Sequence, residues 1–159
     1  MGSAGLSNRK VLQMTTTVIR RIKEADKAEW QMLWCGYNAF YEREVEDRTT
    51  DRVWDALKGK TGEPFCFVAE QGGKLVGFTH YFYLRSTSDW GPRCYMQDLF
   101  VDPSVRGGGV GQSLIEAVYA DADENDAAQT FWLTTTTNKA ARKLYDRVAS
   151  MTPFVKYRR

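Results

Sequence analysis

The stretch DLFVDPSVRGGGVGQSLIEAVYADA, from Asp98 to Ala122, joins an extended segment to an amphipathic helix through three consecutive glycines. Glycine inside a regular element costs about 0.5–1 kcal/mol relative to alanine, so a cluster marks a sharp bend or a close approach of the backbone to another group. A strand and a helix abut the glycines directly, which excludes a disordered linker. The helix has one apolar stripe, formed by Leu114, Ile115, Val118, Tyr119 and Ala122.

The glycine turn does not match two familiar phosphate-binding loops. A P-loop requires GxxxxGK[ST], but Gln112 and Ser113 follow Gly111 and no lysine is present. A dinucleotide-binding fingerprint starting at Gly109 would need a further glycine where Leu114 stands. Two interpretations stay open: a tight turn without a ligand, and a helix N-terminus whose unpaired N–H groups bind a phosphate or pyrophosphate.

Composition predicts one ordinary globular domain. The chain has 159 residues, of which 43% are hydrophobic, and a net charge of +2, which gives no electrostatic basis for a dedicated nucleic-acid binder. No segment reaches the ~20 apolar residues that span a membrane. Three widely spaced cysteines and a single histidine predict a reducing, cytoplasmic setting without a disulfide framework or a metal site. Residues 1–13 are expected to be a disordered leader or tag remnant before a single domain over 14–159.

Periodicity predicts a mixed α/β order, β-α-α-β-β-β-α-β-α-β. The expected strands are 16–22, two strands within 64–85 joined by a hairpin turn at 71–74, 94–102, 130–137 and 153–157. Four helices are expected. The first follows Asp26 as its cap, and the second spans 49–59, with Thr50 or Asp51 as its cap and Gly59 at its end. The third spans 110–123, and the fourth spans 138–149 with Asn138 as its cap. This order favours an α/β sandwich around one sheet over a doubly wound parallel sheet.

Two ordered motifs resemble the GNAT superfamily of N-acetyltransferases. The first is the family pattern Q/R-x-x-G-x-G/A, which is matched by Arg106, Gly109 and Gly111. The second resembles the later segment N-x-x-A-x-x-L-Y, which is matched by Asn138, Ala141, Leu144 and Tyr145. The resemblance covers roughly residues 15–159. It implies a three-layer fold with a mostly antiparallel central sheet, a splayed parallel strand pair and helices on both faces.

The resemblance also implies that acetyl-CoA is the co-substrate. In the family, main-chain N–H groups of the glycine loop hold the pyrophosphate, a role that falls here to Arg106, Gly107, Gly108, Gly109, Val110, Gly111 and Gln112. The preceding strand binds the pantetheine arm and the acetyl group through its main chain, which implicates Leu99, Phe100 and Val101. On the last helix, Asn138, Ala141 and Tyr145 are expected to face the cofactor.

Catalysis is expected to use a tyrosine and an aspartate. The resemblance makes Tyr145 the general acid, and a phenol with a pKa of about 10 suits a departing thiolate whose pKa is about 8.5. Asp98 is a candidate to bind a cationic substrate or to act as a base through water, although a solvated charge at a strand edge is an equal alternative. Gln97 stands where related polyamine acetyltransferases carry a second acid, and Glu70 is a lesser candidate.

The predicted function is direct transfer of an acetyl group to a primary amine, because no cysteine matches a position that carries the acetyl group. Asp98 and the acidic segment 41–47 favour a small cationic amine or polyamine, and protein lysine stays open; segment 41–47 is more simply a solvated face. The alternatives are a catalytically silent CoA-binding regulatory module and an adaptor that uses the basic C-terminus. A homodimer through the edge of strand 153–157 is also expected.

Overall fold

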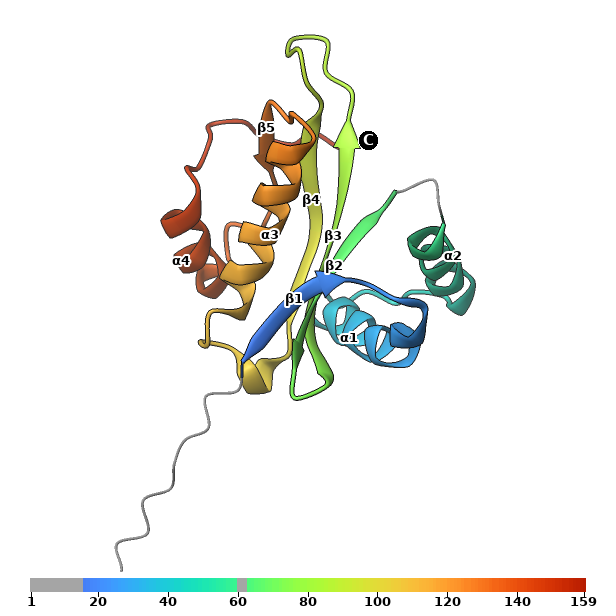
Figure 1. The fold of residues 1–159 in the computed structure, drawn as a ribbon. Coiled ribbons are helices and arrows are strands. Elements are labelled where there is room, and N and C mark those ends of the chain that lie inside the picture. The colour runs from blue at the N-terminus through green and yellow to red at the C-terminus, as the bar shows by residue number, and fades with distance from the viewer. Residues whose placement is uncertain (1–15, 60–62) are drawn as a thin grey trace, which may run out of the picture.

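The protein folds around a single mixed sheet in a computed structural model that describes residues 16–59 and 63–159 (Figure 1). The strands are β1 (Thr17–Arg21), β2 (Phe65–Gln71), β3 (Lys74–Leu84), β4 (Arg93–Val101) and β5 (Gln129–Phe131). They lie in the order β1-β2-β3-β4-β5. The first three pairings are antiparallel and β4 pairs with β5 in parallel, which confirms the predicted sheet.

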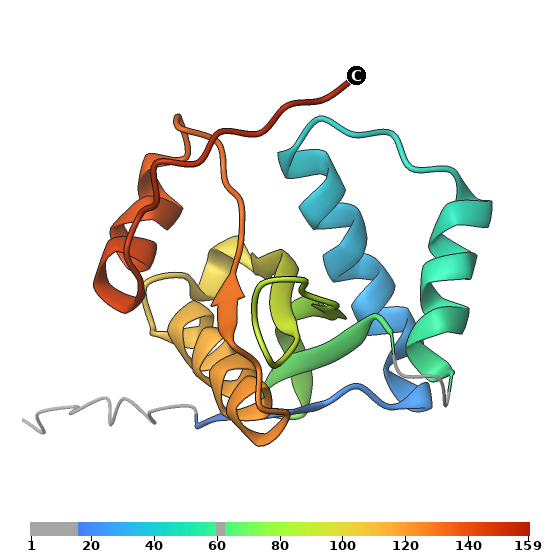
Figure 2. The same cartoon turned by 90° about the horizontal axis from the view of Figure 1, so that it is seen from above.

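Helices cover both faces of this sheet, so the molecule has three layers (Figures 1 and 2). On one face lie α1 (Lys27–Phe40) and α2 (Asp47–Lys58), and on the other lie α3 (Val110–Glu124) and α4 (Lys139–Val148). Two short 3-10 turns, η1 (Glu24–Asp26) and η2 (Pro103–Val105), precede α1 and the glycine loop. In the part of the chain that the structure describes, no helix is long and apolar enough to cross a membrane.

Each face of the sheet has its own apolar core. The α1 face is built from aromatic and aliphatic side chains that α1 and α2 press onto β2, β3 and β4: Trp30, Leu33, Trp34, Tyr37, Trp54, Cys66, Val68, Phe78 and Phe100. The α3 face is built from Tyr81, Cys94, Met96, Ile115, Val118 and Ala122. The spacing of Trp30, Leu33, Trp34 and Tyr37 along α1 therefore serves the core, as the sequence predicts.

A bulge in β4 decides which side chains reach which core. Gln97 is an extra residue there, because β3 pairs with Asp98 on one side of it and with Met96 on the other. One extra residue reverses the alternation of side chains along a strand. Met96 therefore packs on the α3 face, whereas Asp98 and Phe100 face α1.

The start of α2 needs correction, whereas α1 follows Asp26 as predicted but lacks the capping bond. Helix α2 begins at Asp47, with Glu46 at its N-cap, so neither Thr50 nor Asp51 caps it, although Gly59 ends it as predicted. Thr50 instead is buried and accepts a hydrogen bond from the indole N–H of Trp34. Asp26 stands at the N-cap of α1 without a capping bond, because its carboxylate accepts bonds from the Lys23 main chain and the Arg20 guanidinium.

The C-terminal strands are also shorter than predicted. β5 ends at Phe131, so residues 132–137 are not part of the strand, and residues 153–157 form no strand and pair with none. Residues 150–159 are exposed and run from α4 across the molecule toward the α1 side (Figures 1 and 2). High β-propensity makes a strand only where a neighbouring strand accepts its hydrogen bonds, and sequence alone does not supply that neighbour. The predicted leader, residues 1–13, lies outside the described residues.

Candidate functional site

Strand β4 has a free edge next to the glycine loop. Its parallel pairing with β5 covers only Arg93–Tyr95 opposite Gln129–Phe131. Beyond Tyr95 the strand continues to Val101 paired with β3 alone, so main-chain groups on its other edge are open. Leu99, predicted to bind through its main chain, has its main-chain groups toward this open edge. Phe100 forms a hydrogen-bonded pair with Phe78 in the ladder that ends with the Asp102 N–H on the Val76 carbonyl, so its main-chain groups point to β3 and the prediction for Phe100 is wrong. The carbonyl of Val101 is different, because it accepts a hydrogen bond of 3.0 Å from Nε of Arg106.

The glycine loop presents bare amides at the start of α3. Gly107 and Gly109 have φ of +84° and +82°, a conformation that favours glycine, and a Cβ at either position would meet nothing within 4 Å. Gly109 is the N-cap of α3 and offers no side-chain cap. The first main-chain bond of the helix runs from Ser113 N–H to the Gly109 carbonyl, and no hydrogen bond among the described residues uses an amide of residues 107–112. Such an end combines unpaired donors with the positive pole of the helix, which suits an anion.

Not every glycine of the motif faces open space. A Cβ at Gly111 would lie 3.2 Å from a Leu144 methyl group and 3.7 Å from Val101. Gly111 therefore lets α3 pack closely against β4 and α4, which is a structural reason for a motif glycine that sequence analysis assigned to the ligand. The Gln112 side chain donates to Glu116 at 2.8 Å and is turned along the helix.

Arg106 lies on the α1 side of the loop. Its guanidinium carbon is 5.6 Å from the ring centroid of Phe100 and 5.9 Å from that of Phe40. It borders a groove of about 610 Å³ between α1, the start of β3 and η2, which Met32 and Leu75 also line. The side chain thus brings a positive charge to the loop from the face of the sheet that α1 covers.

Tyr145 lies on α4, next to Leu144, which lies close to Gly111 of the glycine loop. Its ring is half-buried and packs against Trp132, with 5.3 Å between the ring centroids. Burial raises the pKa of Tyr145 to about 12, and nearby Tyr41 adds to the shift. The phenol is therefore protonated at neutral pH and able to donate a proton. Asn138 stands at the N-cap of α4, but its amide donates to Thr134 at 3.1 Å and does not cap the helix.

Asp98 is buried, with 4% of its surface exposed, and is not a solvated charge at a strand edge. One carboxylate oxygen accepts a 2.6 Å bond from the Tyr37 hydroxyl, and the other lies 3.0 Å from Nδ1 of His80. The indole N–H of Trp30 donates to Nε2 of His80 at 3.0 Å. Because indole is only a donor, Nε2 is unprotonated and the proton of the neutral ring sits on Nδ1, facing Asp98.

These four residues form a continuous buried chain, Trp30–His80–Asp98–Tyr37, that ties α1 to β3 and β4. Burial, followed by the charge of Asp98, holds the pKa of Tyr37 far above its usual range, so Tyr37 stays a donor. His80 is buried and links Trp30 to Asp98, and Asp98 reaches the α1 face only because of the bulge at Gln97.

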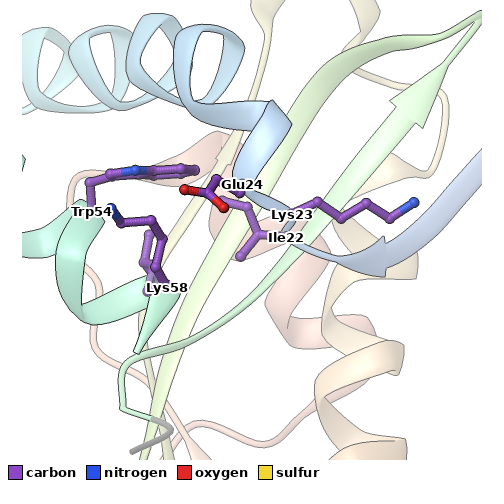
Figure 3. Close-up of a pocket in the computed structure, with 6 residues that line it drawn as sticks. Ile22, Lys23, Glu24, Trp54 and Lys58 are labelled. Carbon is purple, nitrogen blue, oxygen red and sulfur yellow. The ribbon is translucent and has the colours of Figure 1, made fainter. Parts of the chain in front are cut away.

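Glu70, the lesser candidate, lies away from this site. It forms a salt bridge of 2.7 Å with Arg20 of β1, and β1 is the edge strand opposite β5. A separate hollow of about 180 Å³ lies between α2 and the β1–α1 connection. Figure 3 shows Trp54 and Lys58 beside Glu24 at this hollow, which contains none of the predicted site residues.

No group of three or more histidine, cysteine, aspartate and glutamate side chains within residues 16–59 and 63–159 is placed to hold a metal ion. Cys35, Cys66 and Cys94 are free thiols. Burial raises the pKa of Cys94 to about 11 and holds that of Cys66 higher still, so neither is a nucleophilic thiolate at neutral pH.

A model of the acetyltransferase (GNAT) family matches residues 27–149. The chain belongs to this family. It is 34% identical over 155 residues to a D-amino-acid N-acetyltransferase of Saccharomyces cerevisiae, covering 89% of each chain. It is 31% identical over 150 residues to a thialysine N-epsilon-acetyltransferase of Sus scrofa, covering 83% of this chain and 82% of that one.

Solved structures show the same fold. An aminoglycoside N-acetyltransferase in complex with CoA superposes with a TM-score of 0.77 at 20% identity, over 94% of this chain and 97% of that one. A ribosomal-protein-alanine N-acetyltransferase from Brucella melitensis gives the same TM-score at 20% identity, over 89% and 97%. The GNAT protein described here is accordingly an acyltransferase that uses acetyl-CoA, and the unpaired amides of residues 107–112 fit a diphosphate.

The buried chain around Asp98 makes a stability prediction. Asp98→Ala leaves the Tyr37 and His80 donors without partners, and each unsatisfied buried donor costs about 1–3 kcal/mol. Asp98→Asn keeps the shape, and its amide can still pair with both neighbours, so we expect a smaller loss. Urea unfolding of the two variants measures this difference. Equal stability of wild type and Asp98→Ala would show that the chain does not hold α1 to the sheet.

Proposed function

We propose that this GNAT protein transfers the acetyl group of acetyl-CoA directly to the primary amine of a small molecule. The observation that carries the proposal is the row of unpaired amides at residues 107–112, which lies beside the end of β4 and, through the close approach of Gly111 to Leu144, beside the helix that carries Tyr145. A catalytically silent CoA-binding module would also need the unpaired amides and the open edge of β4, but it has no use for a protonated tyrosine beside them.

In this proposal the cofactor lies along one continuous path. Its pyrophosphate accepts bonds from amides of the loop, Arg106 to Gln112, and its pantetheine arm pairs with the free edge of β4 at Leu99. Val101 contributes through its amide, since Arg106 occupies its carbonyl. On α4, half-buried Asn138 and Ala141 line the other side of the path.

The chemical step is a single displacement. The amine nitrogen attacks the thioester carbon, the C–S bond breaks, and Tyr145 donates its proton to the departing thiolate. The nitrogen loses a proton to water, and water returns a proton to the tyrosinate. Holding amine and thioester together can supply ~7–11 kcal/mol of the barrier. Direct attack fits this chain because its two buried thiols, Cys66 and Cys94, are held protonated.

In this scheme Asp98 does not contact the amine directly. Both of its oxygens accept hydrogen bonds, so it reaches the amine through the Tyr37 hydroxyl or a water molecule. Its buried negative charge favours positive charge on the attacking nitrogen. We propose this electrostatic role, since a direct ion pair with a cationic acceptor would require breaking the chain described above.

For the acceptor, we propose an amine carried by a small amino acid. The named relatives act on D-amino acids and on the side-chain amine of thialysine. The sequence-based preference for a small cationic amine or polyamine relied on an accessible Asp98, and that support is weakened by its burial. Polyamines and protein lysine are the alternatives that an amine panel distinguishes.

Two further expectations from the sequence stay proposals. Free cysteines are consistent with a cytoplasmic location. A homodimer is supported by the C-terminal segment, in which Met151, Phe154, Val155 and Tyr157 are exposed.

The loop assignment predicts a loss of cofactor affinity in Gly109→Ala. A methyl group at φ +82° is strained and projects into the space where the diphosphate would lie, so we expect the Kd for acetyl-CoA to rise by about 10-fold or more. Gly73→Ala is the matched control, because Gly73 has φ +78° and equally open surroundings in the β2–β3 turn. Both variants should lose similar stability, but calorimetric titration should show weaker binding only in Gly109→Ala.

The acid role of Tyr145 predicts a specific kinetic signature. Tyr145→Phe should lower kcat by about 10- to 100-fold where chemistry limits turnover, toward the low end for general acids because a thiolate leaves readily. Tyr119→Phe, which removes a hydroxyl from the same aromatic cluster, is the control. Because the pKa of Tyr145 lies near 12, the wild-type kcat should show no fall with an apparent pKa near 10. An unchanged kcat in Tyr145→Phe, measured by CoA release over the amine panel, would refute the assignment.

The dimer proposal predicts that the apolar tail drives association. Phe154→Ser combined with Val155→Ser should shift the protein toward monomer in sedimentation velocity, whereas Lys156→Ser should not. A wild-type protein that sediments only as a monomer would contradict it.

A further inference from the structure

Arg43 is held over the aromatic side chains at the end of α1. Its main-chain N–H donates to the Asn38 carbonyl at 3.0 Å, and the preceding Glu42, with φ +52°, turns the chain back over the helix. The guanidinium carbon lies 4.8 Å from the ring centroid of Tyr41 and 5.9 Å from that of Tyr37. A guanidinium stacked in this way keeps its N–H edge free for a planar anion.

The charge of Arg43 acts on the interior of the site. Tyr95 of β4 has a pKa raised by burial and by Asp98, and Arg43 opposes that shift. Arg43 likewise opposes the rise in the pKa of Tyr37. The guanidinium of exposed Arg43 therefore lies near Tyr37 and Tyr41, on the face of the sheet that α1 covers.

Arg43 also lacks an acidic partner. Within the described residues no carboxylate lies within salt-bridge distance of it, whereas Arg20, Arg21 and Arg93 each pair with an aspartate. The acids of its own segment do not neutralise it: Glu46 pairs with Arg48, and Glu42 and Glu44 are exposed.

The negative charge of Asp98 and the positive charge of Arg43 thus lie at opposite ends of a row formed by the Tyr37 and Tyr41 rings. The buried carboxylate of Asp98 binds the Tyr37 hydroxyl, the Tyr37 and Tyr41 rings meet at 5.1 Å between centroids, and Arg43 covers Tyr41. Tyr41 in turn lies near enough to Tyr145 to raise its pKa. This arrangement is complementary to a zwitterion, with its amine toward Asp98 and Tyr145 and its anionic end toward Arg43.

We propose that Arg43 is a specificity-determining residue that binds the carboxylate of the acceptor, so that the enzyme selects amino acids over amines without an acidic group. This inference rests on the acetyl transfer proposed above. A polyamine would place positive charge against Arg43, whereas a carboxylate can accept two parallel bonds from it.

Paired acceptors that differ only in the acidic group test this role. Alanine and alaninamide present an α-amine, and Nα-acetyl-lysine and its carboxamide present only a side-chain amine. We expect the wild-type kcat/KM to be higher for the acid than for the amide in at least one pair. Arg43→Gln should lower kcat/KM for that acid by about 10- to 100-fold and change little for its amide. Arg43→Lys should recover part of the preference. Arg52→Gln, an exposed arginine on the neighbouring α2, should behave as wild type.

The possible outcomes separate the role of Arg43 from the proposed acetyl transfer. Equal use of acid and amide by wild type, or turnover only of amines without an acidic group, would overturn the role of Arg43 and leave acetyl transfer intact. A higher KM for acetyl-CoA in Arg43→Gln, with an unchanged acid-to-amide ratio, would assign the guanidinium to the cofactor and also overturn the role. No acetylation of any amine by a protein that binds acetyl-CoA would overturn the proposed function itself.

Discussion

The placement of Asp98 is the constraint on which the acceptor side of this protein depends. A carboxylate that is 4% exposed is tolerable only when its oxygens are hydrogen-bonded, and here Tyr37 and His80 supply the donors. Because Trp30 fixes the tautomer of His80, a single chain of bonds sets the distance of α1 from β3 and β4. The helix that carries Tyr37 and leads to Tyr41 and Arg43 is thereby fixed over the sheet.

The bulge at Gln97 makes that placement possible. Without the extra residue, Asp98 would share a face with Met96 and would point into the apolar core under α3. With it, β4 serves two purposes along its length: its first half packs on α3, and its second half offers Asp98 and Phe100 to α1. The same strand keeps an open edge toward β5, since the parallel pairing stops at Tyr95. One strand therefore connects the glycine loop, the proposed cofactor path and the acceptor side.

The two sides of the sheet contribute different chemistry. The α3–α4 side offers bare amides and a phenol whose pKa is raised by burial, which suits an anionic cofactor and a thiolate leaving group. The α1 side offers a buried anion, two tyrosine rings packed edge to face, and a guanidinium that forms no salt bridge among the described residues, which suits a small acceptor that carries both charges. Tyr41 lies at the meeting point, in contact with Tyr37 and close enough to Tyr145 to influence its pKa.

Local sequence by itself determined the glycine loop, the helices α3 and α4 and the β2–β3 hairpin. Their signals are short-range: consecutive glycines, apolar residues at helical spacing, and a Gln71–Lys74 turn whose two glycines adopt positive φ. Two motifs along the chain were enough to indicate the family. The family match over residues 27–149 agrees with that reading of the sequence.

Only the tertiary structure decided the environment of the acceptor side. Gln97 carries no local signal of a bulge, so nothing in the sequence turned Asp98 from a strand edge into the core. Arg43 sits in a segment that reads as acidic, and its place over the tyrosine rings depends on the turn at Glu42 and on rings two and six residues before it. The C-terminal segment 153–157 has the composition of a strand, but a strand exists only where another supplies its hydrogen bonds. Burial, register and pairing are properties of contacts between distant segments, and a single sequence does not state which contacts form.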